Sequence, residues 1–396
     1  MRTVPLGDVC HVTTGQSAPQ ESTAFGSSGT PFVRAGSLER LCAGASEESL
    51  ELVPSDQAVK FRLKKFPKDT IVFAKSGMSA KLGRVYRLRR ECHVVSHLAA
   101  VLPSRDIEPA YLLRWFECSP PSRLIENDAY PSIKTSTLEK IPVHLPEIAE
   151  QRRIAAILDK ADALRFKRRN AIAKLDQLLQ SVFLDMFGDP VSNPKSWPRV
   201  PFSEILERIE SGNSPVCLDR AKNENEWGVL KLGAVTRCRF DPSANKALPN
   251  ETSFDERLEV KVGDLLFTRK NTYELVAACA YVHRTPERLL LPDLIFRLRL
   301  KEPALAHPRY LQSLLTYPRK RSEVQSLAGG SAGSMPNISK AKLNNALIEL
   351  PPFSLQEKFS RLVEHIEQHR HALQRHATQL DTLFASLQHR AFSGEL

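Results

Sequence analysis

Three short polar segments of the chain carry side chains suited to DNA recognition, and each segment occurs twice. The pairs are residues 14–17 and 211–214, 34–37 and 231–234, and 75–81 and 269–273. Arg and Lys donate to guanine O6 and N7, Asn and Gln pair with adenine, and Ser and Thr suit phosphate oxygens. Small residues in the same segments let a backbone approach a ligand closely. The candidate DNA-binding residues are Gln16, Ser17, Arg34, Lys75, Ser76, Ser79, Lys81, Asn213, Ser214, Lys231, Arg269, Lys270, Asn271 and Tyr273.

Any one of these segments, taken alone, is better explained as a polar surface turn. Their recurrence at matched points of the chain favours DNA recognition instead. The net charge of +11 supports a polyanionic partner. Dividing the chain at Gly188 leaves 27 Lys and Arg against 21 Asp and Glu in the first part, and 29 against 24 in the second. Basic runs at 62–65, 84–90 and 319–321 predict salt-dependent binding.

The segments belong to an internal repeat that covers most of the chain. From Pro131 onward the second copy follows the first at a constant offset of 205 residues, without gaps. Earlier offsets drift between 194 and 205, so the length changes fall in the globular parts, where loops absorb them. The matched pairs include Pro131/Pro336, Ile133/Ile338, Leu145/Leu350, Gln151/Gln356, Leu175/Leu380 and Phe187/Phe392.

Each copy ends in a long amphipathic stretch that predicts a helix of about 35 residues, roughly 50 Å long at 1.5 Å per residue. The predicted apolar seam, a narrow stripe typical of helix pairing, has heptad spacing. In the first helix it consists of Ile154, Ile157, Ala161, Leu164, Arg168, Ala171, Leu175, Leu178, Val182 and Asp185, and the second is offset by 205. Ser354 and Glu357 suggest a capping box, and glycines 188 and 394 are stop signals. Packing of each helix on its own globular part is the alternative.

The predicted architecture is α+β, with two mixed α/β globular segments, each followed by a long helix. The globular segments are 1–145 and 190–349, the second with a short entry linker, and the helices are 146–189 and 350–396. The helices should pair as an antiparallel coiled coil with pseudo-two-fold symmetry. Short apolar runs predict strands, and two Pro-led runs predict short helices. The strands are 70–74, 94–102, 264–268 and 275–282, and the short helices are 109–118 and 308–317.

Motifs for catalysis and cofactor binding are missing from the sequence. It contains no GxxxxGK[ST] loop, no GxGxxG after a strand and no CxxC pair. Leu350-Pro-Pro-Phe353 resembles the catalytic tetrad of amino-methyltransferases but has Leu where a hydrogen-bonding side chain is needed. Cys92, His93 and His97 fit a core strand better than a zinc site. Seven scattered cysteines, no signal peptide and no long apolar run predict a non-catalytic protein of the cytoplasm, without metal or cofactor of its own.

The chain resembles the DNA-specificity subunit of type I restriction–modification enzymes over nearly its whole length. Segments that carry the resemblance in the first copy are Leu145-Pro-Glu-Ile-Ala-Glu-Gln151-Arg-Arg-Ile154, Leu175-Asp-Gln-Leu-Leu-Gln-Ser181 and Asp185-Met-Phe-Gly-Asp-Pro190. Their second-copy equivalents include Leu350-Pro-Pro-Phe-Ser-Leu-Gln356 and Ala391-Phe-Ser-Gly-Glu-Leu396.

The resemblance implies that the two globular segments are target-recognition domains, each for one half of a bipartite, asymmetric site in double-stranded DNA. It implies that the helices set the spacer and dock two methyltransferase subunits, which methylate adenine with S-adenosylmethionine. Restriction subunits would add cleavage that depends on ATP and magnesium. Gln151-Arg-Arg153 becomes Gln356-Glu-Lys358 in the second copy, so docking strength would differ between the two ends.

Two other functions are open at this point. A structural or transcription-regulatory protein with tandem DNA-binding domains predicts regulatory footprints and no methyltransferase partner. A fused methyltransferase predicts that the isolated chain binds an adenosyl cofactor. The DNA site itself and the base that each side chain recognises cannot be predicted from the sequence.

Overall fold

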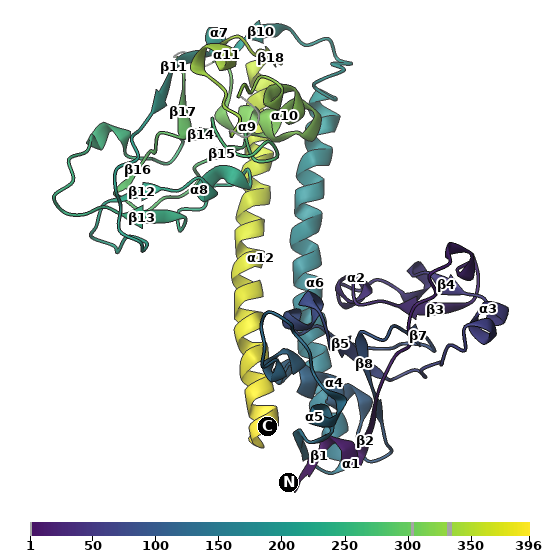
Figure 1. Ribbon diagram of the computed structural model, residues 1–396. Helices are drawn as coiled ribbons and strands as arrows, with labels where there is room; N and C mark the ends of the chain where they lie inside the picture. The colour runs from purple at the N-terminus through teal and green to yellow at the C-terminus, as the bar shows by residue number, and fades with distance from the viewer. Residues whose placement is uncertain (1, 302–304, 331–334) are drawn as a thin grey trace. The chain divides into compact units, whose positions relative to one another are not determined.

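The computed structural model describes residues 2–301, 305–330 and 335–396 (Figure 1). The chain forms two compact units, each built from one globular segment and parts of both long helices. Unit 1 comprises the chain up to Arg169 together with Arg375–Leu396, and unit 2 comprises Asn170–Gln374. Asn170 and Arg375 are equivalent positions of the repeat, so both long helices are divided at the same point. The predicted two-domain, mixed α/β fold with long helices is confirmed.

Unit 1 contains two small sheets and a two-stranded ribbon. The main sheet is antiparallel in the order β2-β8-β5-β6, the second has the order β4-β3-β7, and β1 pairs with β9. The strands are β1 Arg2–Pro5, β2 Cys10–Thr14, β3 Thr30–Val33, β4 Leu52–Val53, β5 Ile71–Ala74, β6 Val85–Arg87, β7 His93–Val94, β8 Leu98–Pro103 and β9 Pro142–Leu145. The short helices are α1 Leu6–Val9, α2 Ser37–Cys42, α3 Ser55–Lys60, α4 Pro109–Cys118 and α5 Thr135–Glu139.

Unit 2 repeats this topology. Its sheets have the orders β11-β17-β14-β15 and β13-β12-β16, and β10 pairs with β18. The strands are β10 Arg199–Pro201, β11 Leu206–Ser211, β12 Gly228–Leu230, β13 Asn245–Ala247, β14 Leu265–Thr268, β15 Cys279–Tyr281, β16 Leu289–Leu290, β17 Ile295–Leu300 and β18 Leu347–Glu349. The helices are α7 Phe202–Ile205, α8 Gly233–Thr236, α9 Pro308–Thr316, α10 Pro318–Gln325 and α11 Lys340–Asn344.

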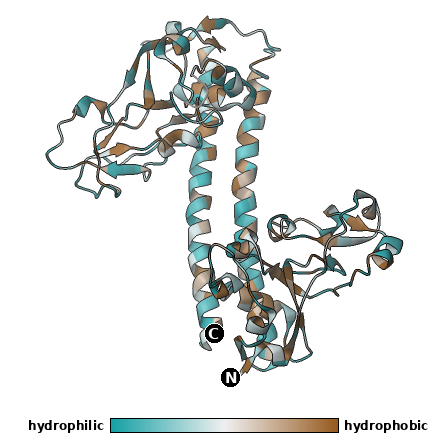
Figure 2. Ribbon diagram, in the orientation of Figure 1, coloured by the Kyte–Doolittle hydropathy of each residue, from teal (hydrophilic) through white to brown (hydrophobic). Residues whose placement is uncertain are grey.

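The short helices α4 and α9 fasten each main sheet to a long helix. Proline starts both of them, and each buries a tyrosine that donates a hydrogen bond across the unit. Tyr111 Oη donates to the carbonyl of His144 at 2.8 Å, and Tyr310 Oη donates to the carbonyl of Glu349 at 2.7 Å. Apolar residues are found in the strands of each globular segment (Figure 2), and all four residues of β5 and of β14 are buried. The two predicted short helices are confirmed, the second ending one residue earlier.

The long helices are α6, Ile148–Phe187, and α12, Phe353–Ser393. With 40 and 41 residues, each is about 60 Å long and thus longer than the sequence predicted. In unit 1 the beginning of α6 shares a core with the end of α12, and in unit 2 the end of α6 shares a core with the beginning of α12. The two helices are therefore antiparallel within each unit. Gly188 and Gly394 have positive φ and end them as predicted.

The predicted heptad seam is partly correct. In α6, Ile154 is buried and Ile157, Ala161, Arg168, Ala171, Leu175 and Val182 are half-buried, but Leu164, Leu178 and Asp185 are exposed. The inward stripe instead continues through Leu158, Arg165, Ile172, Leu179 and Met186. The same replacement occurs in α12, where Val363, Arg370, Ala377, Phe384 and Ala391 take the places assigned to Leu362, His369, His376, Leu383 and Arg390. A hydropathy pattern predicts the wrong inward positions here because it counts an inward-facing arginine as polar and an exposed leucine as apolar.

Three further predictions need correction. The helix α12 begins at Phe353, so Ser354 lies inside the first turn and the predicted capping box does not form. The apolar run 94–102 is not one strand, because a turn separates β7 from β8 and the Leu98 amide donates to the Val95 carbonyl at 3.0 Å. The run 275–282 is a strand only over Cys279–Tyr281, since its first residues form a turn against Thr272.

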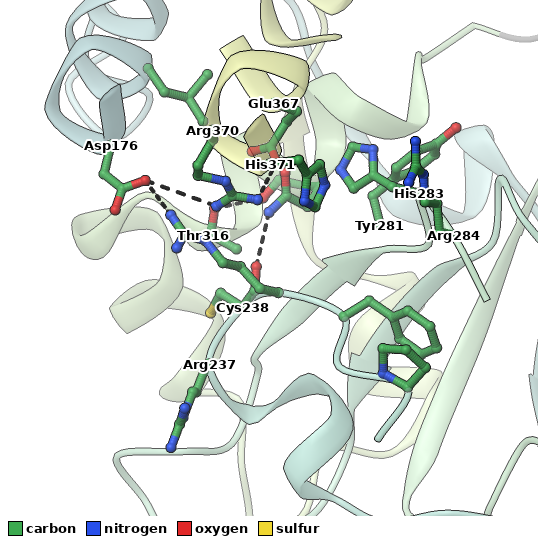
Figure 3. A pocket seen from close by; sticks show the side chains of 15 residues that line it. Asp176, Arg237, Cys238, Tyr281, His283, Arg284, Thr316, Glu367, Arg370 and His371 are labelled. Atoms are coloured by element: carbon green, nitrogen blue, oxygen red, sulfur yellow. Dashed lines mark hydrogen bonds and ion pairs between the residues drawn. The ribbon is translucent and has the colours of Figure 1, made fainter. Parts of the chain in front are cut away.

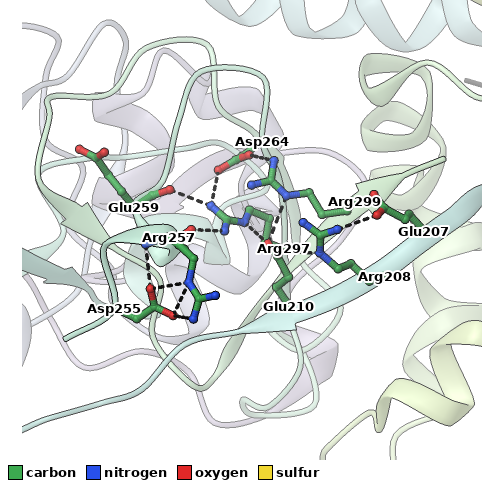
Figure 4. A network of polar contacts seen from close by, with 9 residues as sticks. All are labelled: Glu207, Arg208, Glu210, Asp255, Arg257, Glu259, Asp264, Arg297 and Arg299. Atoms are coloured by element: carbon green, nitrogen blue, oxygen red, sulfur yellow. Dashed lines mark hydrogen bonds and ion pairs between the residues drawn. The ribbon is translucent and has the colours of Figure 1, made fainter. Parts of the chain in front are cut away.

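Unit 2 contains a buried charged network that unit 1 lacks (Figure 4). Arg297 is 1% exposed and forms ion pairs with Glu210 at 2.5 Å and Asp264 at 3.2 Å. Its guanidinium group also donates to the carbonyls of Arg257 and Glu259. The network therefore ties the loop at 255–261 to the main sheet. At the matching register of unit 1, Thr13 pairs with Ala100, so no charge is buried there.

Candidate nucleic-acid interface

In unit 1 the three predicted recognition segments surround one turn, Val94–Leu98, which joins β7 to β8. The Gln16 amide donates to the Val94 carbonyl at 2.9 Å, and the Ser96 amide donates to the Gln16 carbonyl at 2.8 Å. The Val95 amide donates to Val33, next to the second segment, at 3.0 Å, and the Lys75 amide of the third segment donates to His97 at 2.9 Å. Segments far apart in sequence are thus brought to one edge of the two sheets.

Unit 2 builds the same arrangement around the equivalent turn, Leu291–Ile295. The Gly212 amide donates to the Pro292 carbonyl at 3.1 Å, and the Arg269 amide donates to the Leu294 carbonyl at 3.1 Å. The strands β12 and β16 run parallel and in register, so Lys231 leaves the sheet at the same edge as this turn. The main-chain scaffold of the loop cluster therefore occurs twice, once in each unit.

A glycine in the first segment makes each cluster possible. A Cβ atom on Gly15 would lie 2.0 Å from the Val94 carbonyl oxygen, and one on Gly212 would lie 1.6 Å from that of Leu291. Any larger residue would push the first segment away from the turn. These glycines are needed for close backbone approach and not for a left-handed conformation, since neither has a positive φ.

Several predicted contact residues in unit 1 present unoccupied polar groups. In the described part of the chain, the side chains of Ser17, Lys75 and Ser79 have no hydrogen-bond or ion-pair partner. An ammonium group at the cluster without a carboxylate partner is available to a phosphate or a guanine edge. The exposed ring of Tyr130 follows in the loop that leads to Ser132, which pairs with Ser76.

Four other predicted residues of unit 1 are engaged within the protein. The Gln16 amide group donates to the carbonyl of Arg62 and accepts from the amide of Lys64, so it fixes a neighbouring loop. Arg34 pairs with Glu51 at 2.6 Å, and Lys81 pairs with Asp128 at 2.9 Å. The Ser76 hydroxyl is hydrogen-bonded to His97 Nδ1 at 2.9 Å. Their role at the interface is to hold the cluster in shape unless DNA displaces these partners.

In unit 2 the predicted residues divide in the same way. Among the described residues, the side chains of Asn213, Lys231 and Lys270 have no partner, and Tyr273 is exposed. Ser214 donates to Asp293, while Asn271 is buried and caps the amide of Thr272. The Arg269 guanidinium group lies 5.6 Å from the Phe296 ring centroid, and its Nε has no hydrogen-bond partner. All fourteen positions remain predictions as DNA contacts.

The basic runs around the clusters are largely neutralised by local ion pairs. Lys65 pairs with Glu91 at 2.8 Å, Arg84 with Glu39 at 3.3 Å and Arg90 with Glu48 at 2.6 Å. In unit 2, Arg319 pairs with Asp189. These ion pairs reduce the positive charge that the basic runs present to a DNA phosphate. The lysines of the loop clusters that have no ion-pair partner therefore contribute relatively more to the attraction of DNA.

Sequence reasoning missed the turn residues that connect the three segments. Ser96 and His97 in unit 1 and Asp293 in unit 2 touch the predicted segments. Ser96 and His97 lie inside the apolar run 94–102, which was predicted to be a strand, and Asp293 lies outside every predicted element. The signal was the polar pair Ser96-His97, which interrupts an apolar run, and the Pro292-Asp293 pair, which is typical of a turn.

The cysteines behave as buried or unreactive thiols. Burial raises the pKa of Cys10 and of Cys92 to about 12, well above the usual range of a thiol. His93 Nδ1 is hydrogen-bonded to the carbonyl of Lys64 at 2.8 Å, and burial lowers its pKa. Among the described residues no cluster of three or more His, Cys, Asp or Glu has metal-binding geometry. In the same residues no helix has the length and hydrophobicity needed to cross a membrane.

Comparison with known proteins finds similarity to one family. The type I restriction modification DNA specificity domain matches residues 1–176. The EcoKI specificity subunit of Escherichia coli K12 is 24% identical over 392 residues, 92% of this chain and 82% of that protein. The EcoEI specificity subunit of Escherichia coli is 31% identical over 176 residues, which are 44% of this chain but only 30% of that relative.

The fold agrees with this assignment. The S subunit of a type I restriction–modification system from M. genitalium has a TM-score of 0.61 at 12% identity, with 99% of this chain and 96% of that chain covered. A chain from a complex-assembly study of a type I restriction–modification system has a TM-score of 0.53 at 17% identity, with 100% and 98% covered. Over nearly its whole length the chain is thus similar in fold to S subunits of type I restriction–modification systems, and its first 176 residues match the family's specificity domain.

Proposed function

We propose that each unit recognises one half of a bipartite, asymmetric DNA site through its loop cluster. The observation that carries this proposal is the duplicated cluster: in both units main-chain hydrogen bonds join the first and third segments to one turn, while the side chains differ. Lys75 corresponds to Arg269, Ser76 to Lys270 and Ser96 to Asp293. A conserved scaffold with different donors and acceptors suits two unlike half-sites.

The long helices, in this proposal, set the spacer between half-sites and dock two methyltransferase subunits. Support comes from apolar side chains that the helices leave exposed outside the inward stripe. Leu178 of α6 and Leu383 of α12 are equivalent in the repeat and are 46% and 51% exposed. Two equivalent apolar positions fit two copies of one partner. The partners would supply S-adenosylmethionine for adenine methylation, and a restriction subunit, where present, would use ATP and magnesium. The chain itself is proposed to be non-catalytic and cytoplasmic.

The first test is a comparison of methylated adenines in the genome of the source cells with and without an intact copy of this gene. We expect one bipartite motif to lose methylation at all its sites when the gene is removed, and to regain it when the gene is restored. An unchanged methylation pattern, in cells that express the neighbouring methyltransferase, would count against the proposal. Binding of an adenosyl cofactor by the isolated chain would instead favour the fused-enzyme alternative.

The second test separates the two half-sites. Lys75→Ala should weaken recognition of one half and Arg269→Ala that of the other, because each lies in a different cluster. Arg105 and Lys301 provide charge-matched controls. They are exposed basic residues that follow the last residues of β8 and β17, whereas the loop clusters lie where these strands begin. We expect Arg105→Ala and Lys301→Ala to leave methylation of the motif unchanged. Equal effects of all four substitutions would point to nonspecific electrostatic binding only.

A further inference from the structure

Unit 2 contains a cavity of about 490 Å³ beside the long helices that is not part of the loop cluster. Its walls come from α6, α9, α12, the segment after α8 and the segment after β15 (Figure 3). Arg370 of α12 lies on one side, with Asp176 and Glu367 next to it, and Tyr281, His283 and Arg284 lie across the cavity. A cavity of this size is within the range of small-molecule sites, about 300–1,000 Å³.

Arg370 is buried without enough partners. It is 6% exposed, and its guanidinium group is hydrogen-bonded to Glu367, three residues earlier. The Nε and Nη1 atoms are buried and have no hydrogen-bond partner, and the nearest Asp176 oxygen is 3.9 Å from Nη1. Leaving buried donors of a charged group unpaired is costly, so a missing acceptor is expected on this side of the guanidinium group.

The equivalent arginine of unit 1 has complete partners. Arg165 occupies the same repeat position as Arg370, and it pairs with Asp381 at 2.6 Å and with Asp162 at 3.0 Å. It also lies over the ring of Phe384, 4.2 Å from the centroid. Asp162 and Asp381 are the repeat equivalents of Glu367 and Asp176. Both units therefore retain the acidic residues, and the difference between them lies elsewhere.

Three smaller side chains create the space in unit 2. In unit 1, Arg114 reaches the helices and pairs with Glu117, Asp159 and Asp162. Through the alignment of α4 with α9, Arg114 corresponds to Ser313 and Glu117 to Thr316. Leu179 of α6 stands where α12 has Phe384. The Ser313 hydroxyl is buried without a partner, next to a second hollow of about 220 Å³.

The charge of the cavity favours an anion. Its walls carry the guanidinium groups of Arg237, Arg239, Arg284 and Arg370 against two carboxylates, Asp176 and Glu367. Asp176 is already paired with Arg239, and Glu367 with Arg370. Burial lowers the pKa of His283 to about 4, and the charges of Arg309 and Arg370 add to the shift. The ring is therefore neutral at pH 7, and the arginines alone leave an excess of positive charge.

We propose that this cavity binds a small phosphate-bearing anion, with a phosphate oxygen accepting from a free N–H of Arg370. A charge-assisted hydrogen bond from a guanidinium group to a phosphate oxygen is short and strong, and Nε and Nη1 both have a free donor for it. The rings of Tyr281, His283 and His371 line the rest of the cavity and suit an organic substituent. A phosphate of a DNA duplex is a poor alternative, because a rigid double helix cannot reach a guanidinium group this deeply buried.

Isothermal titration calorimetry of the full-length chain tests the site, with inorganic phosphate and adenosine monophosphate as probes at constant ionic strength. We expect one molecule of each probe to bind per chain. Arg370→Gln should weaken binding on the order of tenfold or more, because charged hydrogen bonds to the phosphate are lost. Arg165→Gln is the matched control in unit 1, and it should leave the affinity for phosphate unchanged.

A second variant protects the test against a folding defect in Arg370→Gln. The triple substitution Leu179→Phe, Ser313→Arg and Thr316→Glu gives unit 2 the side chains that fill unit 1, while Arg370 remains. We expect it to fold, as judged by circular dichroism, and to lose phosphate binding. Phosphate binding of equal strength in the wild type and this triple variant, or none by the wild type at millimolar phosphate, would overturn the proposal. Displacement of phosphate by a short DNA duplex would also overturn it, because the site would then belong to the DNA backbone.

Discussion

The side-chain amides of Gln151 and Gln356 make the same three hydrogen bonds at the beginning of the two long helices. Gln151 Nε2 donates to the carbonyls of Asp106 and Pro146, and Oε1 accepts from the amide of Glu108 at 2.8 Å. Gln356 Nε2 donates to Leu305 and Pro351, and its Oε1 accepts from the amide of His307 at 2.8 Å. Each glutamine thus joins a long helix to the segment that precedes α4 or α9.

Replacing either glutamine should destabilise its own unit. Gln151→Ala and Gln356→Ala each leave one amide and two carbonyl groups buried without partners, since the glutamines are 1% and 0% exposed. We expect a loss of about 3 kcal/mol in the free energy of unfolding, measured by chemical denaturation. Gln177→Ala, at an exposed position of α6, is the control and should stay within about 0.5 kcal/mol of the wild type. A matching loss in the control would mean that the loss does not come from these hydrogen bonds, because alanine is a better helix former than glutamine.

The repeat register predicted that Gln151 and Gln356 are equivalent, but not what they do. Two of the three partners of each glutamine lie more than forty residues earlier in the sequence, and only the fold brings them together. The predicted heptad seam is wrong at Leu164 for a related reason. Arg165 and Arg370 face inward because carboxylates on the neighbouring helix and one turn away accompany them. A hydropathy pattern cannot show this pairing, so the more apolar Leu164 was preferred.

The loop clusters were predictable as segments and not as an arrangement. Side-chain type and repetition singled out residues 14–17 and 75–81, and the structure places both against the turn Val94–Leu98. That turn is hidden in an apolar run, so its role as the common support could not be inferred. Which lysines lack a carboxylate partner also depends on tertiary contacts, as Lys75 and Lys81 illustrate.

The buried network of unit 2 predicts a specific loss of stability in acid. Burial would raise the pKa of Glu210, but hydrogen bonds from Arg208 and Arg297 and the charges of Arg297 and Arg299 outweigh it and bring the pKa to about 2. This is below the value of about 4.3 in an unfolded chain. The ionised carboxylate therefore stabilises the folded state above pH 4.3, and this contribution is lost as the pH falls toward 2.

The measurement is the denaturation midpoint of the wild type and of Glu210→Gln between pH 5 and pH 2.5. We expect the wild type to be the more stable at pH 5 and the difference to shrink as the pH falls through this window. Glu207→Gln removes an exposed carboxylate next to Arg208 and serves as the control, with a difference from the wild type that hardly varies with pH. A Glu210→Gln difference that stays constant with pH would contradict the predicted shift.

The glycines of the first recognition segment should tolerate no side chain. In Gly212→Ala the new Cβ would lie 1.6 Å from the Leu291 carbonyl oxygen, so the segment must move away from its turn. We expect a loss on the order of 3 kcal/mol in the free energy of unfolding and weaker methylation of one half-site. Gly233→Ala, in the second segment of the same unit, meets Ala244 Cβ at an ordinary 3.7 Å and is the control. Equal stability of the two variants would show that the segment adapts freely.

The same comparison is available in unit 1. Gly15→Ala would bring a Cβ atom 2.0 Å from the Val94 carbonyl oxygen, whereas a Cβ on Gly36 meets nothing within 4 Å. If the two clusters serve different half-sites, Gly15→Ala and Gly212→Ala should affect opposite halves of the motif. Loss of the same half in both variants would be inconsistent with one cluster for each half.

Insertion of a heptad in both long helices should lengthen the spacer of the DNA site. The natural points are after Arg169 in α6 and after Gln374 in α12, where the two compact units meet in sequence. Seven residues extend a helix by about 10 Å, the length of roughly three base pairs, and they preserve the phase of the inward stripe. We expect methylome sequencing to show both half-sites unchanged and a spacer longer by about three base pairs.

A five-residue insertion at the same two points is the control, because at 3.6 residues per turn it leaves the two halves of the inward stripe about 140° out of phase. Arg165 and Arg370 lie on that stripe within about two turns of the insertion points, and the ion pair of Arg165 with Asp381 joins the two helices in unit 1. The rotated variant should therefore lose methylation of the original motif without gaining one with a regular longer spacer. An unchanged spacer in the heptad variant would show that the helices do not measure the distance between half-sites.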